Sequence, residues 1–505
     1  MYTYNKLYFQ YKKLYSSYLE KITIILNNYH EKKHSKDYWE PIIGLYLRRF
    51  ISNYLFLNKE NKNRLFKKVS YKNSFFHKSY SDYSETENHL FFKFKNIDNC
   101  EHYKLKKINF LLEKINTINS IIPNILIKLG ITKVLFQESY FRKNLKTLFS
   151  LKSNFYFNSL PLVKLGNYKI DREKIFKNRL NLIKLYEVEN EQDFLLQNIV
   201  FSMPINYVEN FKIILNEVKK INLSKALYVD GNEVKFDFIK FYIAELMLKK
   251  KKILIGQHSL RTGLEDYDIY FDYSKSISDN YLTWGWDSKL NSIIKYSSIR
   301  IFSSLNKYKK VKSIKNNGFN ICFILCSFAK IGECFADNYR ENLKAEKARV
   351  HLLQKIQKQR NCKITLKPRN GSFLVKDKNK FYNKFDILKK KSRMYEIFGN
   401  YNIVIFERLS LGIAECIHLN QPTIFYYPKN LYKQKSKEYN NLLLLLKKAN
   451  IYFDDEKKIS KLLNSKTNIS LWWNNKKNFE NRKTFLKKYA NCFEFSHFTK
   501  IKKLV

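Results

Sequence analysis

Short apolar runs alternate with segments of helical spacing in two separate stretches, and this alternation constrains the fold of the chain most strongly. In the first stretch, apolar runs at 225–230 and 252–256 flank a segment in which Val234, Phe238 and Tyr242 recur at four-residue spacing. This spacing places the three side chains on one face of a helix. A strand, a helix and a second strand within about 30 residues form the unit of a parallel sheet.

The second stretch repeats this pattern closer to the carboxyl terminus. Apolar runs at 319–326, 362–366, 402–406 and 422–427 indicate strands, and a long polar helix is expected at 338–359. Alternation in both halves predicts an α/β fold with two Rossmann-like parallel-sheet domains that face each other across a cleft.

An added helical region is expected before the first sheet. Apolar residues near Ile22 follow helical spacing, the aromatic segment around Trp39 indicates a core helix, and residues 79–88 indicate a polar loop. Residues 288–317 show no clear period and are expected to contain the linker. We therefore divide the chain into an N-terminal domain at 1–300 and a C-terminal domain at 301–505.

The formal net charge of +49 raises the question of an anionic partner. Lysines are spread along the chain in short clusters, whereas a nucleic-acid groove would concentrate them beside stacking aromatic residues. We therefore expect attraction to an anionic membrane surface and no nucleic-acid partner. A basic nucleic-acid-binding protein stays open as an alternative from a different class.

Other features of composition point to the cytoplasm. No apolar run reaches the roughly 18 residues of a membrane span, and the first residues lack the pattern of a secretory leader. The 7 cysteines include no Cys-x-x-Cys pair, which fits reduced thiols better than a disulfide framework or a zinc site. We predict a cytoplasmic protein that is peripheral at the inner face of the membrane.

The strand expected at 252–256 is followed directly by Gln257 and His258. In open parallel sheets, ligands bind outside the carboxyl ends of the strands. Histidine can accept or donate a proton near neutral pH, since its ordinary pKa is about 6.5. His258 is therefore a candidate catalytic group, and a histidine that is merely held in a turn is the simpler alternative.

The strand expected at 402–406 leads through a turn into a helix that begins at Ser410 or Gly412. The free amides and the positive dipole end of such a helix can hold a phosphate. Glu415 lies one turn further on, where a carboxylate can accept hydrogen bonds from ribose hydroxyls. The alternative is structural: Ser410 caps the helix and Glu415 favours its dipole. The sequence leaves both interpretations open.

Several sequence elements, taken in order, resemble a known family. They are Tyr38-Trp39 with the following Pro-Ile-Ile-Gly-Leu-Tyr-Leu, Gln257-His258 with Gly263, the segment from Ser278 to Trp286, the helix of Glu415 with Pro422 beyond it, and Trp472-Trp473. The Glu415 element looks like the nucleotide-binding end of the C-terminal domain in GT-B glycosyltransferases. Together the elements resemble a bacterial transferase family associated with surface-carbohydrate biosynthesis of the O-antigen, capsule or lipopolysaccharide kind.

This resemblance implies a metal-independent GT-B glycosyltransferase that moves a sugar from a nucleotide-activated donor to a surface glycan or a lipid-linked acceptor. The N-terminal domain would lie on the acceptor side, and the C-terminal domain would bind the donor and end in a closing helix. The donor is a substrate, and no further cofactor is implied. His258 would be catalytic, and the residues that hold the donor would be Gln257, Arg261, Lys367, Arg369, Ser410, Gly412 and Glu415. A polyol-phosphate transferase or a nucleotide-sugar epimerase on the same fold is the alternative.

The sequence departs from the family pattern at both candidate loops. Ser259 and Leu260 stand where the family has glycines, and Gly412 stands where a hydroxyl residue is common. The segment at 266–268 matches the metal-binding Asp-x-Asp of the other large glycosyltransferase fold. Patterns of three residues arise often by chance, so we assign this segment no metal.

Overall fold

The computed structural model describes most of the chain. The described ranges are 2–60, 110–115, 117–138, 143–161, 163–168, 172–184, 191–306, 319–325, 339–359, 362–368, 381–388, 397, 399–428, 436–464 and 468–505. The loop expected at 79–88 and the donor-binding candidate Arg369 lie outside these ranges. No helix in the described ranges is both long enough and apolar enough to cross a bilayer.

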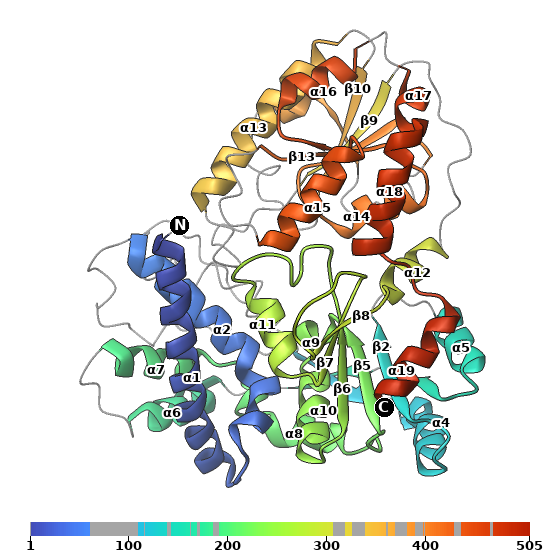
Figure 1. Ribbon diagram of the computed structural model, residues 1–505. Coiled ribbons are helices and arrows are strands. Elements are labelled where there is room, and N and C mark those ends of the chain that lie inside the picture. Colours follow the sequence, from blue (N-terminus) through green and yellow to red (C-terminus); the bar gives the residue numbers. More distant parts are fainter. Residues whose placement is uncertain are drawn as a thin grey trace.

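The first domain is built on a 6-stranded parallel sheet with the order β3-β2-β5-β6-β7-β8 (Figure 1). Its strands are β2 (Val134–Glu138), β3 (Phe157–Ser159), β5 (Ala226–Asp230), β6 (Lys252–Gly256), β7 (Asn280–Thr283) and β8 (Ile293–Lys295). Its helices are α4 (Thr117–Lys128), α5 (Lys143–Lys152), α6 (Arg172–Lys184), α7 (Glu191–Ser202), α8 (Phe211–Val218), α9 (Asn232–Lys235), α10 (Asp237–Leu248) and α11 (Ile269–Ser276). A separate antiparallel pair consists of β1 (Phe110–Ile115) and β4 (Val163–Tyr168).

The second domain is built on another 6-stranded parallel sheet, with the order β11-β10-β9-β12-β13-β14. Its strands are β9 (Phe319–Ile324), β10 (Cys362–Lys367), β11 (Asp386–Ile387), β12 (Ile403–Phe406), β13 (Thr423–Tyr426) and β14 (Tyr452–Phe453). Its helices are α13 (Tyr339–Gln357), α14 (Leu411–His418), α15 (Lys437–Lys448), α16 (Glu456–Leu462), α17 (Ile469–Asn474) and α18 (Lys476–Tyr489).

The expected fold class is confirmed: two Rossmann-like parallel-sheet domains of the GT-B type follow an added helical region. The segment 288–317, which is expected to contain the linker, also includes β8 and α12 (Ile299–Leu305). These elements have 3 and 7 residues, too few for a period to show in the sequence. The domain boundary at residues 300 and 301 stays a prediction.

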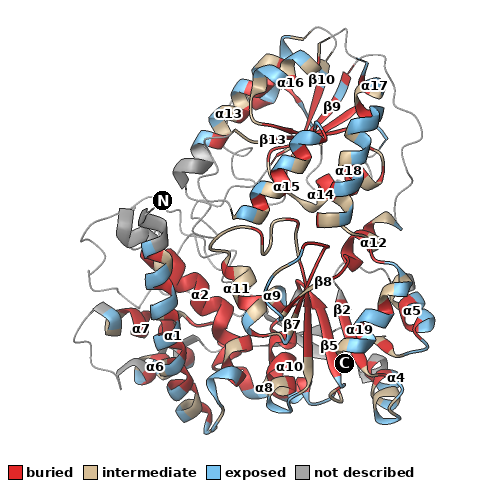
Figure 2. Cartoon of the chain, in the orientation of Figure 1, coloured by how far each residue is buried: buried red, intermediate tan, exposed pale blue. Residues whose placement is uncertain are grey.

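The helical region consists of α1 (Tyr2–His30) and α2 (Lys36–Glu60), and α2 packs against α10 and α11. Figure 2 shows α2, α10 and the central strands of the first sheet as largely buried. The expected core helix around Trp39 is confirmed, because this side chain has no exposed surface. Gly44 permits the close approach, since a Cβ there would lie 2.9 Å from the Tyr15 hydroxyl and 3.5 Å from the Tyr273 ring.

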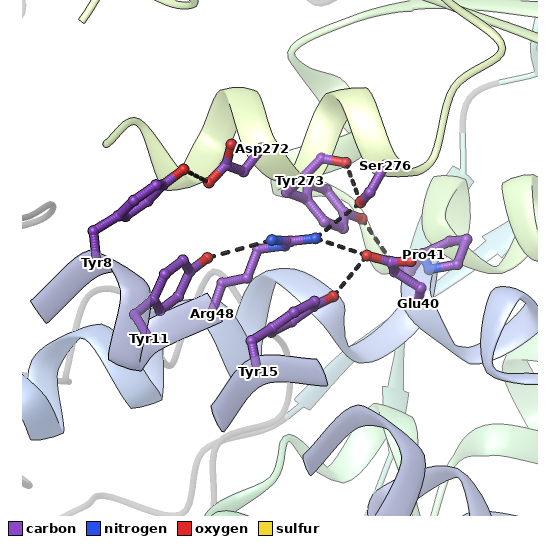
Figure 3. A network of polar contacts seen from close by, with 9 residues as sticks. All are labelled: Tyr8, Tyr11, Tyr15, Glu40, Pro41, Arg48, Asp272, Tyr273 and Ser276. Atoms are coloured by element: carbon purple, nitrogen blue, oxygen red, sulfur yellow. Dashed lines mark hydrogen bonds and ion pairs between the residues drawn. The ribbon is translucent and has the colours of Figure 1, made fainter. Parts of the chain in front are cut away.

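Arg48 of α2 holds the helical region against α11 (Figure 3). Its Nη2 donates to Glu40 Oε1 (2.7 Å) and to the Ser276 hydroxyl (3.1 Å), and its guanidinium lies 3.8 Å from the centre of the Tyr15 ring. Burial lowers the pKa of Arg48, but the neighbouring tyrosine and glutamate groups raise it by more, so the guanidinium stays charged. Helix α11 follows the loop at 257–268, so this contact also fixes the far end of that loop.

The chain passes between the domains twice, and the two passages lie side by side. Ser298, just before α12, donates its N–H to the carbonyl oxygen of Asn491 (2.7 Å), and Phe493 donates its N–H back to Ser298 (3.2 Å). The last helix, α19 (Phe498–Leu504), then packs beside strands of the first sheet, where Phe498 shares a core with Leu254. Loops at the carboxyl ends of the two sheets meet where the Ser436 hydroxyl donates to the carbonyl oxygen of Leu264.

Candidate functional site

Gln257 ties the loop after β6 to the loop after β7. Its Oε1 accepts hydrogen bonds from the backbone N–H of Trp284 and from Nε1 of Trp286, both at 2.8 Å. Its Nε2 donates to the carbonyl oxygen of Ser259 (2.7 Å), and the side chain has no exposed surface. Both ends of the amide are therefore used within the chain, which shapes the loop around His258. Donor binding by Gln257 stays a prediction.

Leu260 and Gly263 hold this loop, although Ser259 and Leu260 stand where the family has glycines. Leu260 is completely buried in the main hydrophobic core, so the loop is anchored from inside. Gly263 has a φ of +81°, and a Cβ there would lie 2.9 Å from the Trp286 ring and 3.1 Å from Phe271. Only glycine fits such a position without strain. The Gln-His motif and the Trp-Gly-Trp motif thus pack as one unit.

His258 lies between the turn that follows β5 and the start of α12. Gly231 in that turn has a φ of +72°, and a Cβ on it would collide with the imidazole. Arg300 of α12 is buried, and its Nη1 donates to the carbonyl oxygen of His258 (2.6 Å). The same nitrogen lies 3.0 Å from Nδ1 and 3.4 Å from Nε2 of the ring. The backbone and the ring of His258 are therefore both fixed by one guanidinium.

Arg300 places a permanent positive charge against His258. A guanidinium has donors only, so its Nη1 bonds to a ring nitrogen only where that nitrogen accepts. Nδ1 is the nearer of the two ring nitrogens.

A buried carboxyl group follows Gly231 in the short helix α9. Glu233 is 1% exposed and accepts a hydrogen bond from the Ser274 hydroxyl of α11 (3.1 Å). Burial raises the pKa of Glu233 to about 7. Neither Glu233 nor Arg300 was identified from the sequence. The Asp-Gly-Asn-Glu turn after β5 was the available signal for Glu233, whereas Arg300 fell in the segment assigned to the linker.

The Asp-x-Asp segment has a structural role in the fold. Asp268 caps α11, because its Oδ1 accepts the N–H groups of Tyr270 (3.0 Å) and Phe271 (3.1 Å). Its Oδ2 accepts from the N–H of Gly263 (3.3 Å), which secures the loop further. Burial raises the pKa of Asp268 to about 6.

Arg261 lies in the same loop as His258 and is partly exposed. Its Nη1 is 3.3 Å from Glu265 Oε1, so part of its charge is offset within the chain. Its contact with a donor phosphate stays a prediction.

A buried ion pair anchors the turn after β12 from behind. Glu407 follows β12 directly and accepts from Arg349 of α13, with Nε–Oε2 at 2.5 Å and Nη2–Oε1 at 2.8 Å. Burial lowers the pKa of Arg349, but the Glu407 carboxylate raises it by more, so the guanidinium remains charged. The bidentate geometry fixes the first residue of the turn that leads to Ser410.

Ser410 stands before the first residue of α14 but does not act as its cap. Its backbone is extended, as at an N-cap, yet its side chain makes no capping hydrogen bond. The capping alternative for Ser410 is therefore wrong. Gly412 and Glu415 are buried in α14, and Lys367 is the last residue of β10. Their roles in donor binding stay predictions, as does that of Arg369.

The two candidate regions are the loop after β6 and the turn after β12. Each lies at the carboxyl end of the strands of its sheet. Helix α12, which carries Arg300, packs against α14, which carries Gly412 and Glu415. Strand β12 borders the point where the strand order of the second sheet reverses, and β5 borders the corresponding point of the first sheet. Ligands of doubly wound sheets bind at such points.

Comparisons with known proteins agree with a transferase. The model of the LIC12162 family transferase matches residues 3–57 and 61–499. Among curated proteins, none matches the sequence significantly.

Solved structures include similar chains at low identity. A UDP-forming α,α-trehalose-phosphate synthase from Burkholderia xenovorans has 8% identity over 74% of this chain and 98% of its own, with a TM-score of 0.39. MurG from Acinetobacter baumannii has 10% identity over 77% and 96%, with a TM-score of 0.35. The UDP-GlcNAc 2-epimerase from Methanocaldococcus jannaschii, in complex with UDP-GlcNAc and UDP, has 13% identity over 74% and 99%, with a TM-score of 0.38. Likeness at these scores does not by itself indicate an activity for this chain.

Proposed function

The chain belongs to the LIC12162 family of transferases, and from this premise we propose that it is a glycosyltransferase. It would move a sugar from a nucleotide-activated donor to a bacterial surface glycan or a lipid-linked acceptor, at the cytoplasmic face of the membrane and without a metal. The observation that supports this most is that the loop of His258 contacts Ser436, just before α15, at the carboxyl ends of two parallel sheets, while α12 packs against α14. The two alternatives, a polyol-phosphate transferase and a nucleotide-sugar epimerase, would give products that differ from the product of sugar transfer.

In this proposal, the second domain binds the nucleotide. The amides at the start of α14 and the Ser410 hydroxyl hold phosphate, since the hydroxyl is not used as a cap. Glu415 accepts from the ribose hydroxyls, and Lys367 and Arg369 offset phosphate charge together with Arg261 of the first domain. Gln257 supports the loop that faces the donor.

We assign His258 the role of a hydrogen-bond donor to the leaving phosphate. During transfer, the acceptor hydroxyl oxygen bonds to the anomeric carbon and loses its proton to water, while the bond from that carbon to the phosphate oxygen breaks and the nucleotide leaves with the electron pair. A ring N–H of His258 would stabilise the charge that develops on that oxygen. Arg300 fixes the ring and the backbone of His258, so it acts as a positioning residue.

Thermal unfolding with CMP, CDP, UDP and GDP tests the enzyme class and narrows the donor. A nucleotide that binds only the folded protein raises its stability by about 2.7 kcal/mol at a hundredfold excess over Kd. Radiolabelled donors then identify the product, which separates sugar transfer from epimerisation and from polyol-phosphate transfer. If none of the four nucleotides raises the melting temperature and His258→Ala leaves transfer unchanged, the proposal fails.

The role of His258 needs its own variants. His258→Gln retains an N–H donor but cannot act as a base near neutral pH, whereas His258→Ala retains neither function. We expect the glutamine variant to keep part of the transfer rate and the alanine variant to lose it by about 100-fold. Equal losses in both variants would instead assign His258 as a general base.

A further inference from the structure

We propose that one end of the first sheet, the end at which its parallel strands begin, is a docking surface for an anionic lipid bilayer. This inference deepens the peripheral membrane association suggested above and rests on that part of the proposed function. The surface, named here the basic edge, consists of the turns at 128–133, 153–156, 219–225 and 248–252, each of which leads into a strand. It occupies the lower end of the first domain in Figure 1, near the ends of α4, α8 and α10.

Backbone hydrogen bonds show that these turns are direct neighbours. The Lys133 carbonyl oxygen accepts from the N–H of Ala226, and the Lys225 carbonyl oxygen accepts from the N–H of Lys252, both at 3.0 Å. On the other side, the Lys133 N–H donates to the carbonyl oxygen of Tyr156 (3.0 Å). The turns therefore form one continuous surface, because the strands they precede are adjacent and parallel.

The basic edge carries a dense positive charge. Its lysines are Lys128, Lys133, Lys219, Lys220, Lys225, Lys249, Lys250, Lys251 and Lys252. Among the described residues, the acidic groups that form ion pairs with these lysines are Glu217, 2.6 Å from Lys220, and Asp279, 3.8 Å from Lys252. The positive charge thus well exceeds the negative charge, and each lysine near an anionic bilayer contributes roughly 1 kcal/mol to binding.

Aliphatic side chains protrude among these lysines. Leu129 is 67% exposed, Ile131 is 42% exposed and Leu248 is 48% exposed. Ile125 on α4 and Phe155 in the turn before β3 are also exposed. Exposed leucine and isoleucine inside a ring of lysine are typical of surfaces that insert into the headgroup region of a membrane. A single-stranded nucleic-acid groove would instead present successive aromatic residues for base stacking, whereas Leu129, Ile131 and Leu248 are aliphatic. The observations therefore favour a bilayer.

The position of the basic edge also indicates what kind of acceptor the site would reach. Strand β6, with 5 residues, separates Lys251 from Gln257. At about 3.3 Å per residue, this places the His258 loop roughly 20 Å from the basic edge. A protein docked by this edge holds its site away from the membrane. Such a site suits the far end of a long glycan chain better than a sugar attached directly to a lipid head group.

Vesicle flotation with the full chain tests the proposal. We expect the wild-type protein to float with vesicles of phosphatidylcholine and phosphatidylglycerol and not with phosphatidylcholine alone. The triple variant Lys219→Gln, Lys225→Gln, Lys249→Gln should bind on the order of 100-fold more weakly. Its control is Lys457→Gln, Lys461→Gln, Lys477→Gln on the exposed surface of the second domain, which removes the same charge. The pair Leu129→Ser, Leu248→Ser should also weaken binding, whereas Leu471→Ser, at an equally exposed site, should not.

Nucleotide-dependent thermal shifts on the same variants separate this inference from the proposed function. Variants that lose vesicle binding but keep the shift support the docking surface and leave the enzyme class untouched. If the two lysine triples weaken vesicle binding equally, the effect is due to net charge alone and the basic edge is not a docking surface. If the wild-type protein ignores both vesicles and binds duplex DNA through these lysines, the surface recognises nucleic acid and the proposal is overturned.

Discussion

The loop after β6 and the turn after β12 both lie at the carboxyl ends of parallel strands, one in each domain, but are held in different ways. Gln257, Leu260 and Gly263 secure the first from several sides through hydrogen bonds and packing. A single buried ion pair, Arg349 to Glu407, secures the second from behind, and the start of α14 has no side-chain cap. The first loop thus fixes its histidine through several contacts, whereas the second leads to a helix start that has no side-chain cap.

Breaking the ion pair gives the largest expected effect. Arg349→Met leaves the Glu407 carboxylate buried without its cation, which we expect to lower the free energy of unfolding by about 3–5 kcal/mol. Urea denaturation followed by far-UV circular dichroism measures this loss. The double variant Arg349→Met, Glu407→Leu removes both charges and is expected to recover most of it. A double variant as unstable as the single one would show that the pair contributes through its specific geometry.

Replacing the side-chain amide of Gln257 tests whether its hydrogen bonds hold the first loop in place. Gln257→Leu leaves the buried N–H groups of Trp284 and Trp286 without an acceptor, which we expect to cost about 2–5 kcal/mol. Gln257→Glu restores an acceptor for both but sets a buried carboxyl group against the Ser259 carbonyl oxygen, so we expect it to recover part of the loss only at a pH at which that group is protonated. Tryptophan fluorescence during urea denaturation reports the change. If the leucine variant is as stable as the wild-type protein, the two tryptophan contacts do not hold the loop.

The pH dependence of the unfolding free energy is a second property in which the two regions differ. The buried carboxyl group of Glu233 lies close to the first loop. The pKa of Glu233 is raised from 4.5 to about 7, so the folded protein retains a proton that the unfolded chain has lost. Unfolding free energy therefore falls as pH rises from 4.5 to 7, by at most about 3 kcal/mol. Glu233→Gln cannot ionise, so we expect it to stabilise the protein at pH 8 and not at pH 4.

A second carboxyl group supplies the control for that measurement. Hydrogen bonds from Lys488 and Tyr489 outweigh partial burial and lower the pKa of Glu438. Glu438→Gln should therefore destabilise the protein at pH values above the ordinary pKa of a glutamate, the opposite sign. Urea midpoints at pH 4 and pH 8 measure both variants. A Glu233→Gln variant with an unchanged pH profile would contradict the buried position of this group.

The sequence predicted the sheets far better than the site. Long apolar runs such as 252–256 and 402–406 identified strands, because a buried parallel strand has few polar residues. Arg300 and Glu233 could not be assigned, since their contacts with His258 and Ser274 join residues 42 and 41 positions apart in the chain. Gln257 shows a related limit, because its hydrogen-bond partners Trp284 and Trp286 lie 27 and 29 positions away, in the loop after the next strand.

The smallest expected effect concerns Ser410, and it tests the contrast between the two regions most directly. Ser410→Ala removes a hydroxyl that makes no capping bond, so stability should change by less than about 0.5 kcal/mol. Ser436→Ala is the matched control, because that hydroxyl caps α15 by accepting from the Tyr439 N–H (3.0 Å). It should cost about 1 kcal/mol or more. In the thermal-shift assay, Ser410→Ala should also weaken stabilisation by the nucleotide, whereas a structural serine would leave that response unchanged. A loss of stability equal to that of Ser436→Ala would mean that Ser410 caps α14 in solution, and the phosphate role would then pass to the backbone amides alone.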